Sequence, residues 1–192
     1  KQTYNNLEFI IVNDGSSDRT LQILENFSSI DNRIKLINQK KNVGLTKSLN
    51  RGLEKVTGEY VARHDADDLS MPKRFDLFIS FLKNNPDLNI YSTPAFLINE
   101  QNDVMRTIPN FFRRNSFNPK TLNYFNSLIH GTLIVKTSVL KESKYDENIK
   151  YCQEFDLYHR LIKKGFTIKY DEKNVSYMLR SHQKQISKKD SI

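Results

Sequence analysis

The first 85 residues alternate between short apolar runs and amphipathic segments, and this alternation constrains the fold more than any other feature of the sequence. Apolar runs at residues 7–13, 34–37 and 60–63 are each typical of a buried strand. The segments that follow them carry apolar side chains at helical spacing, and Ser17 or Asp18 is expected to cap the first helix. A strand–helix pattern repeated three times predicts a parallel sheet covered by helices.

Beyond residue 85 the pattern becomes mixed. Strands are predicted at residues 90–93, 132–135, 167–170 and 175–179, and a helix is predicted at residues 153–164. Residues 110–126 carry aromatic and basic side chains without a clean period, which favours an irregular loop. A chain of 192 residues is long enough for one compact core, so we expect a single α/β domain with a mixed, mainly parallel sheet.

The charge is distributed unevenly along the chain. Residues 1–105 have a net charge of −1, whereas residues 106–192 have a net charge of +9. A basic half of this kind can attract nucleic acid, an anionic membrane surface or a phosphorylated substrate. Lysines spread over a solvated surface explain the same excess equally well.

Cysteine content and hydropathy indicate the compartment. Cys152 is the single cysteine, so the chain has no internal disulfide, and no apolar run approaches the 18 residues that a membrane-spanning helix needs. With no secretory signal recognised at the start, we expect a cytoplasmic protein.

Two groups of aspartates follow predicted strands. Asp14 follows the first strand, and Asp65, Asp67 and Asp68 follow the third. Because the carboxyl ends of parallel strands meet at one edge of a sheet, both groups are expected at the same edge, where such sheets bind ligands. Closely spaced carboxylates repel one another unless a cation neutralises them, so the Asp-x-Asp pair favours a Mg²⁺ or Mn²⁺ site. A solvated turn, with Asp68 or Ser70 capping the next helix, is the alternative.

Six segments together resemble the inverting glycosyltransferases of family 2, which have the GT-A fold. They are IVNDGSSDRT (11–20), NVGLTKSLNRGLEKVTGEYVARHDADD (42–68), SMPKRF (70–75), HGTLIVKTSVL (130–140), CQEFDLYHRL (152–161) and YMLRSHQKQIS (177–187). The resemblance implies transfer of a sugar, a hexose in type, from a nucleotide-sugar, with UDP-sugars preferred. It also implies inversion, a Mn²⁺ or Mg²⁺ cofactor and a role in polysaccharide, lipopolysaccharide or capsule biosynthesis.

The resemblance assigns a role to each matched residue. Nucleotide-sugar contacts are implied for Asp14 at the base, Asp65 at the ribose, and Gly15, Ser16, Gly44 and Arg63. Metal binding is implied for Asp65, Asp67 and His182, and an acceptor-side position for His130, Gly131 and Asp156. The catalytic base is expected to be Glu154, two positions before Asp156-Leu157, where the family usually has Asp.

The resemblance also predicts how the chain is organised. Residues 1–95 would form the nucleotide-sugar-binding part and residues 96–192 the acceptor and catalytic-base part of one GT-A domain. The apolar first strand of the family, which ends in a Pro-x-Tyr-Asn segment, has no counterpart here, so the domain is expected to be incomplete at its N-terminal side. The acceptor is expected to be a glycan or a lipid-linked glycan at the inner face of the plasma membrane, with an anionic membrane surface as a further partner and no nucleic acid.

Other functional classes predict other motifs. A nucleotidyltransferase would also join an α/β sheet to an Asp pair, but it is expected to carry a Gly-rich phosphate loop near its first strand. A dinucleotide-binding dehydrogenase would have GxGxxG after a strand, and no predicted strand has it. A nucleic-acid-binding module would interleave aromatic and basic residues, as only Phe111-Phe112-Arg113-Arg114 does.

Overall fold

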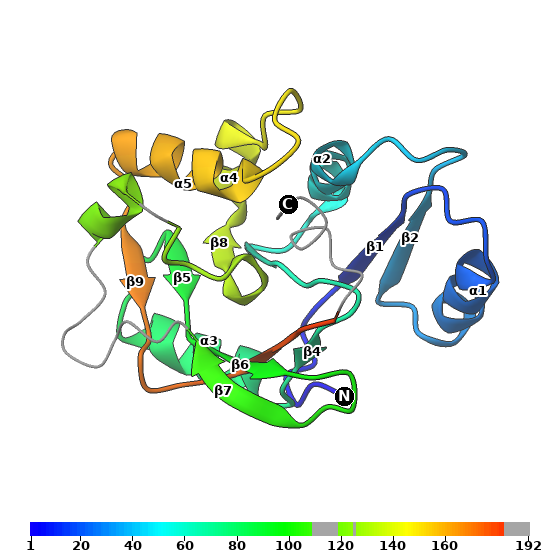
Figure 1. The fold of residues 1–192 in the computed structure, drawn as a ribbon, viewed down its shortest axis with the longest axis horizontal. Helices are drawn as coiled ribbons and strands as arrows, with labels where there is room; N and C mark the ends of the chain where they lie inside the picture. Colours follow the sequence, from blue (N-terminus) through cyan, green and yellow to red (C-terminus); the bar gives the residue numbers. More distant parts are fainter. Residues whose placement is uncertain (109–118, 125, 183–192) are drawn as a thin grey trace. The chain divides into compact units, whose positions relative to one another are not determined.

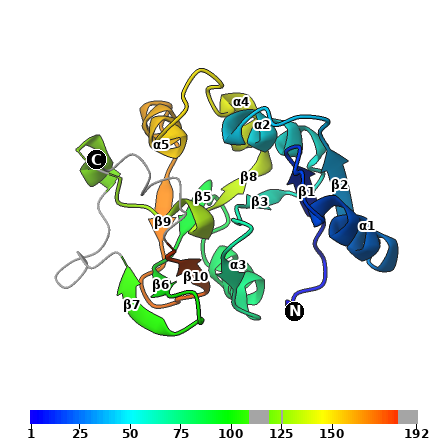
Figure 2. The same ribbon diagram turned by 45° about the vertical axis from the view of Figure 1, so that its right-hand side comes forward.

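The computed structural model describes residues 1–108, 119–124 and 126–182. The chain divides into two compact units whose segments interleave along the sequence. Unit 1 comprises Lys1–Tyr4, Ala62–Ile134 and Thr167–Ile192, and unit 2 comprises Asn5–Val61 and Val135–Phe166. Figures 1 and 2 show the helices and strands of both units.

Unit 2 begins with a strand–helix–strand motif. Strand β1 (Phe9–Asn13) pairs in parallel with β2 (Ile34–Asn38), and helix α1 (Thr20–Ile30) connects them. The N-cap of α1 is Arg19, without a capping bond from its side chain, so the predicted caps Ser17 and Asp18 were wrong. The Asp18 carboxylate instead accepts the N–H of Thr20 at 2.9 Å, just before the first helical hydrogen bond. In register, Asn13 lies opposite Asn38, so two polar residues end the paired strands side by side.

The other helices of unit 2 carry most of its buried side chains. They are α2 (Leu45–Lys55), α4 (Thr137–Ser143) and α5 (Gln153–Lys163). Their buried apolar side chains include Leu53, Val139, Leu140, Leu157 and Leu161. Helix α2 lies close to β1 at Gly52, where an added Cβ would be 3.3 Å from a methyl group of Val12.

Unit 1 contains a four-stranded sheet in the order β4-β10-β6-β7. Its strands are β4 (Leu69–Ser70), β6 (Ala95–Ile98), β7 (Val104–Ile108) and β10 (Tyr177–Arg180), and helix α3 (Arg74–Lys83) follows β4. Strand β10 pairs antiparallel with β4 and parallel with β6. The last strand within the described residues is thereby hydrogen-bonded to the strand that directly follows the aspartates at 65–68.

A second four-stranded sheet has the order β3-β8-β5-β9, with β5 (Ile90–Ser92) and β9 (Ile168–Tyr170) paired in parallel. The boundary between the units falls within β3 (Tyr60–Ala62) and β8 (Ile134–Lys136). Ile90, Tyr91, Leu133 and Ile134, from this sheet and the residue before β8, are buried in the core. The short 3-10 helices His130–Thr132 and Pro119–Asn123 complete the described part of the chain.

The predicted α/β class with helices beside a mixed sheet is confirmed, but one expectation about the sheet was wrong. Strands β1 and β3 were expected in one sheet, whereas β1 pairs with β2 in a sheet of two strands. The segment around β3 bonds instead with the segment around β8: Arg63 N–H donates to Leu133 O, and Thr137 N–H donates to Glu59 O. The irregular loop predicted at 110–126 lies mostly outside the described residues. The predicted division at residues 95 and 96 is a functional one, and it stays a prediction.

Candidate functional site

The aspartates after β3 form a tight turn, residues 65–68, which we call the acidic turn. The N–H of Asp68 donates to Asp65 O at 3.2 Å and closes it. Two side chains from the C-terminal end of unit 1 reach it. His182 Nε2 lies 2.9 Å from Asp67 Oδ2, and Arg180 Nε donates to Asp67 O at 2.7 Å. The Asp67 side chain is 43% exposed and that of His182 is 24% exposed, so a ligand from solvent can reach this pair.

Asp65 faces a different partner. Its carboxylate is paired with Arg63, whose guanidinium also donates to His64 O. The N–H of Asp65 donates to the phenol oxygen of Tyr177 at 3.1 Å. The backbone N–H of Asp65 is therefore bound by Tyr177 of the same unit, while its carboxylate is paired with the guanidinium of Arg63.

Asp68 is buried, with 5% of its surface exposed. Its carboxylate accepts Tyr177 OH at 2.7 Å and the N–H of Arg180 at 2.8 Å. Burial raises the pKa of Asp68 to about 6, although these two hydrogen bonds oppose that change. Asp68 binds strand β10, so the alternative in which it caps the next helix is wrong; α3 has Lys73 at its N-cap.

Two histidines of unit 1, His64 and His130, have lowered pKa values. Burial, and secondarily the positive charge of Arg74, lowers the pKa of His64 to about 4. Desolvation and nearby Arg63 lower the pKa of His130 to about 3. Gly131, beside His130, leaves room for the ring of Tyr177, because an added Cβ would lie 2.5 Å from that ring. Packing alone therefore requires glycine here.

The turn after β1 in unit 2 is built differently. Asp14 Oδ1 accepts the N–H of Val43 at 2.8 Å and Gln39 Nε2 at 3.0 Å, and Asp14 Oδ2 accepts the N–H of Gly44 at 2.9 Å. Gly15 has φ +72, and an added Cβ would lie 2.5 Å from Lys41 C. The carboxylate thus shapes the loop between β2 and α2, and we call residues 14–16 with 39–44 the Asp14 loop.

Asn13, Asn38 and Gln39 complete this arrangement, and the sequence interpretation missed them. Ser16 Oγ donates to Asn13 Oδ1 at 2.6 Å, and Asn13 Nδ2 donates to Asn38 Oδ1 at 2.8 Å. Gln39 Nε2 also reaches Ser48 Oγ at 2.8 Å. Consecutive polar residues at the end of an otherwise apolar strand are the signal that could have identified them.

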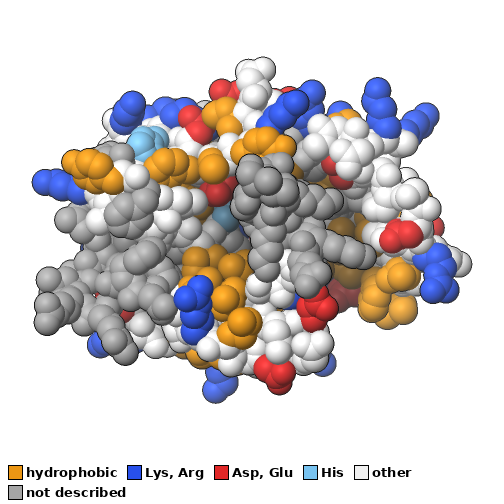
Figure 3. Space-filling model, in the orientation of Figure 1, with side chains coloured by type: hydrophobic (Ala, Val, Ile, Leu, Met, Phe, Trp, Pro, Cys, Tyr) orange, Lys and Arg blue, Asp and Glu red, His pale blue; other side chains and the backbone are white. Residues whose placement is uncertain are grey.

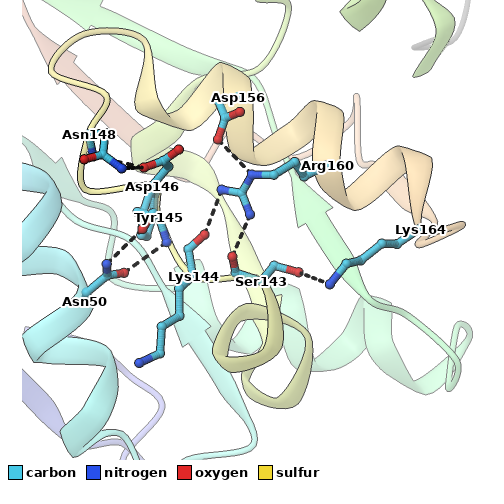
Figure 4. A network of polar contacts seen from close by, with 9 residues as sticks. All are labelled: Asn50, Ser143, Lys144, Tyr145, Asp146, Asn148, Asp156, Arg160 and Lys164. Atoms are coloured by element: carbon cyan, nitrogen blue, oxygen red, sulfur yellow. Dashed lines mark hydrogen bonds and ion pairs between the residues drawn. The ribbon is translucent and has the colours of Figure 1, made fainter.

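Helix α5 carries the two predicted acids of the C-terminal half. Glu154 lies in its first turn and is half-buried. Asp156 accepts Arg160 Nε at 2.8 Å, and Arg160 in turn donates to Ser143 O at 2.6 Å and Lys144 O at 2.8 Å, at the end of α4 (Figure 4). Asp156 therefore orients Arg160 so that it binds the C-terminal carbonyl groups of α4, which have no partner within that helix. Its acceptor-side role stays a prediction.

The segment that leads into α5 is anchored on α2, as Figure 4 also shows. Asn50 Nδ2 donates to Tyr145 O at 2.9 Å, and Tyr145 N–H donates back to Asn50 Oδ1 at 3.0 Å. Thr46 Oγ1 donates to Ile149 O at 3.1 Å. Glu154 thus lies in the first turn of a helix whose preceding loop is bound to α2 at two points.

The donor groups of the acidic turn suit a hard divalent cation. Carboxylates of Asp65 and Asp67 are hard oxygen ligands, and the imidazole of His182 is acceptable to Mn²⁺. Within residues 1–108, 119–124 and 126–182, no three His, Cys, Asp or Glu side chains gather so that they could hold a metal ion. Mg²⁺ commonly takes one or two protein carboxylates together with substrate phosphates, so the residues present fit a cation shared with a diphosphate.

Comparison with known proteins identifies relatives in sequence. A family model described as Glycosyl transferase family 2 matches residues 1–146. An uncharacterized glycosyltransferase of Haemophilus influenzae is 32% identical over 192 residues, which cover 95% of this chain and 59% of that protein. The O-antigen biosynthesis glycosyltransferase WbnJ of Escherichia coli is 29% identical over 197 residues, which cover 97% of this chain and 73% of WbnJ.

Solved structures share the fold at low sequence identity. TarS of S. aureus, residues 1–349 in complex with UDP-GlcNAc, matches with a TM-score of 0.76 and 19% identity over 96% of this chain and 53% of that one. The mannosyltransferase PcManGT from Pyrobaculum calidifontis, in complex with GDP-Man and Mn²⁺, matches with a TM-score of 0.69 and 16% identity over 95% and 51%. The chain spans 59% of the Haemophilus relative and 56% of a Methanocaldococcus jannaschii relative, less than two thirds of their length.

Proposed function

Because the chain belongs to glycosyltransferase family 2, we propose that it transfers a sugar from a nucleotide-sugar to a hydroxyl group of a glycan or lipid-linked acceptor, with inversion and with the help of a divalent cation. The donor is a UDP-sugar and the transferred group a hexose. TarS and PcManGT, which share the fold, were solved with UDP-GlcNAc and with GDP-Man and Mn²⁺, so both nucleotides belong in the test.

One observation carries the metal part of the proposal: the exposed contact of 2.9 Å between Asp67 and His182 in the acidic turn. Asp67 and His182 would hold the cation, and Asp65, whose carboxylate is paired with Arg63, would lie against the ribose of the donor. A bound Mn²⁺ or Mg²⁺ would neutralise charge on the departing nucleoside diphosphate. Arg63, which is paired with Asp65, would contribute a second positive charge near the phosphate oxygens of the donor.

The Asp14 loop would receive the nucleotide. Its backbone is held by the Asp14 carboxylate, and Gly44, with φ +96, has no atom within 4 Å of an added Cβ, so a ligand can approach the main chain there. Ser16 and Gly44 would contact the nucleotide-sugar, and Asp14 the base. The hydrogen bonds among Asn13, Asn38 and Gln39 preorganise this loop, so it would need little rearrangement to bind.

Glu154 would act as the catalytic base. It would take the proton from the acceptor hydroxyl as that oxygen attacks the anomeric carbon, on the side opposite the leaving nucleoside diphosphate. Attack from that side inverts the configuration of the carbon. The anchored loop before α5 supports the role, since a base must be held within hydrogen-bond reach of the proton it removes.

Two variants separate binding from turnover. In Asp67→Asn the carboxylate charge is lost, and we expect calorimetry to show that UDP binding in Mn²⁺ falls about 10-fold or more. In Glu154→Gln the size is kept but the base is lost, so transfer should fall about 100-fold while UDP and Mn²⁺ bind as in the parent. GDP is titrated in parallel to identify the nucleotide.

Matched controls are available in each unit. Asp87→Asn removes an exposed aspartate of unit 1, and Glu54→Gln removes an exposed glutamate of a unit 2 helix. Both should bind and turn over as the parent. Equal UDP binding by the parent and Asp67→Asn, with or without Mn²⁺, contradicts the metal assignment, and near-normal transfer by Glu154→Gln contradicts the base.

For the acceptor, we propose a membrane-bound glycan reached at the inner face of the plasma membrane. The support is the +9 net charge of residues 106–192 and the O-antigen relative. None of the helices in the described ranges has the length and apolar character needed to cross a lipid bilayer. Figure 3 shows Lys and Arg side chains at several places on the face drawn, and the lysines at 184, 188 and 189 lie outside the described residues.

Co-sedimentation with anionic and neutral vesicles tests this attachment. Salt-sensitive binding to anionic vesicles is expected. Equal binding to both kinds of vesicle at low salt would exclude it. The segment on which the nucleic-acid alternative rests, Phe111-Phe112-Arg113-Arg114, also lies outside the described residues.

A further inference from the structure

The acidic turn is held from inside unit 1 by one buried phenol. Tyr177, on β10, has 0% of its surface exposed. Its hydroxyl accepts the N–H of Asp65 at 3.1 Å and donates to Asp68 Oδ2 at 2.7 Å. A single oxygen atom thus bridges the first and the last residue of the turn.

The same strand holds the turn at two further points. The N–H of Arg180 donates to Asp68 Oδ1 at 2.8 Å, and its Nε donates to Asp67 O at 2.7 Å. Both oxygens of Asp68 are therefore engaged by β10. Asp68 is buried and fastens the turn to β10, whereas the side chain of Asp67 is accessible to solvent.

The aromatic ring of Tyr177 is tightly packed on several sides. Gly131 lies against one side, where an added Cβ would be 2.5 Å from the ring, and the Arg74 guanidinium lies 4.7 Å from the ring centre. His64 meets the ring edge-on at 5.5 Å. This packing, and not contact with water, determines where the phenol oxygen lies.

Arg74 is itself fixed, with 2% of its surface exposed. It donates to Gly131 O at 2.8 Å, to Arg63 O at 3.0 Å and to Ser70 Oγ at 2.8 Å. These bonds join the segments before, after and beside the acidic turn. A buried arginine with several acceptors forms a rigid junction, because each unmet donor would be costly in a dry environment.

We propose that Tyr177 is a positioning residue that sets the acidic turn through Asp65 and Asp68, so that Asp67 and His182 present a preformed site to the cation. This inference rests on the proposed function of the turn. A cation with few protein ligands depends strongly on their prior orientation, and the removal of supporting hydrogen bonds around a metal site typically lowers metal affinity about 10-fold to 100-fold.

The test is Tyr177→Phe, which keeps the ring and its contacts and removes only the hydroxyl. Mn²⁺ is titrated with and without UDP, and free Mn²⁺ is followed by electron paramagnetic resonance. We expect Mn²⁺ affinity to fall about 10-fold. Hydrogen exchange of the Asp65 amide, measured without any ligand, should become faster because its acceptor is gone.

Tyr91→Phe is the matched control. Tyr91 is as buried, lies in the same unit and donates to buried Asp171 at 3.1 Å. Both variants lose a buried tyrosine–aspartate hydrogen bond, and Tyr177→Phe also leaves the Asp65 N–H without its acceptor, so the melting temperature of Tyr177→Phe should fall by at least as much as that of Tyr91→Phe. Mn²⁺ affinity and exchange at Asp65 should be unchanged in Tyr91→Phe, which separates positioning from general stability.

The outcomes distinguish this inference from the proposed function. If the parent binds Mn²⁺ and Asp67→Asn does not, but Tyr177→Phe and Tyr91→Phe both match the parent in Mn²⁺ affinity, the positioning role is wrong and the metal site stands. If the parent binds no Mn²⁺ even with UDP, the metal site fails, and with it the role of Tyr177 toward a cation. Unchanged exchange at Asp65 in Tyr177→Phe also overturns the inference.

Discussion

The Asp14 loop of unit 2 and the acidic turn of unit 1 both follow a strand and both depend on aspartate, yet they are built in opposite ways. In the Asp14 loop the carboxylate accepts main-chain N–H groups of Val43 and Gly44. In the acidic turn the main chain is held by side chains, through Tyr177 and Arg180. The Asp14 carboxylate fixes the backbone of its loop, whereas the backbone of the acidic turn is fixed by side chains of β10.

This difference separates aspartates with a structural role from the aspartate that is available to a ligand. Asp14 is occupied at both oxygens, and Asp68 is occupied and buried. Asp67 is the acid of the acidic turn that combines exposure with a histidine partner. A carboxylate bound to backbone N–H groups is a structural element first, and an exposed one beside an imidazole is available for a ligand.

The largest expected effect comes from a substitution that disrupts the Asp14 loop. In Gly15→Ala the new Cβ would lie 2.5 Å from Lys41 C and 2.6 Å from Asn42 N, at φ +72. We expect the free energy of unfolding to fall by about 3 kcal/mol or more, measured by denaturant titration. Gly165→Ala is the control, since Gly165 has φ +85 but open space around it. Equal losses in the two variants would mean that the loop does not pack tightly on Gly15.

A smaller effect separates Asp14 from Asp67. In Asp14→Asn one carboxylate oxygen becomes an NH₂ group that faces main-chain donors, so a hydrogen bond is lost inside the loop. We expect a loss of about 1–2 kcal/mol in the free energy of unfolding. Asp67→Asn, at an exposed site, should change it by less than about 0.5 kcal/mol. The comparison fails if the two substitutions destabilise the protein equally in denaturant titration without ligand.

The smallest effect concerns a second backbone-bound acid of unit 2. Burial pushes the pKa of Glu8 upward, but the hydrogen bond from Lys35 and the N–H groups of Thr57 and Gly58 outweigh it and lower the pKa to about 2. Ionised Glu8 therefore stabilises the fold above pH 4.5, its ordinary value, and this contribution is lost as the pH falls toward 2.

Glu8→Gln should remove that pH dependence. Lys35 is 44% exposed, so screening by solvent limits the difference between parent and variant at neutral pH to about 1 kcal/mol. Urea unfolding from pH 7 down to pH 2 measures it, and the difference between the two proteins should shrink below pH 4.5 and become small at pH 2. Parallel curves over the whole range would show that Glu8 contributes nothing through its charge.

Much of the fold was predictable because its signals are local. Strands β1, β2 and β9 and helices α2 and α5 lie within a few residues of their predicted positions, since apolar runs and turn residues lie next to each other in the chain. Strands β4, β6 and β7 and helix α4 were missed. Strand β4 has two residues, and β7 presents mostly exposed side chains, so neither has the alternation of buried and exposed residues that identifies a strand.

The sequence by itself determined the type of site: aspartates after two strands, a glycine in a tight turn, and a histidine in the last described strand region. Only the tertiary structure decided which aspartate does what. Asp68 becomes an anchor because Tyr177, 109 residues later, donates to it, and Asp67 meets His182 across 115 residues. No local pattern encodes such contacts, because they arise when β10 pairs with β4 and β6 and brings distant side chains to the turn.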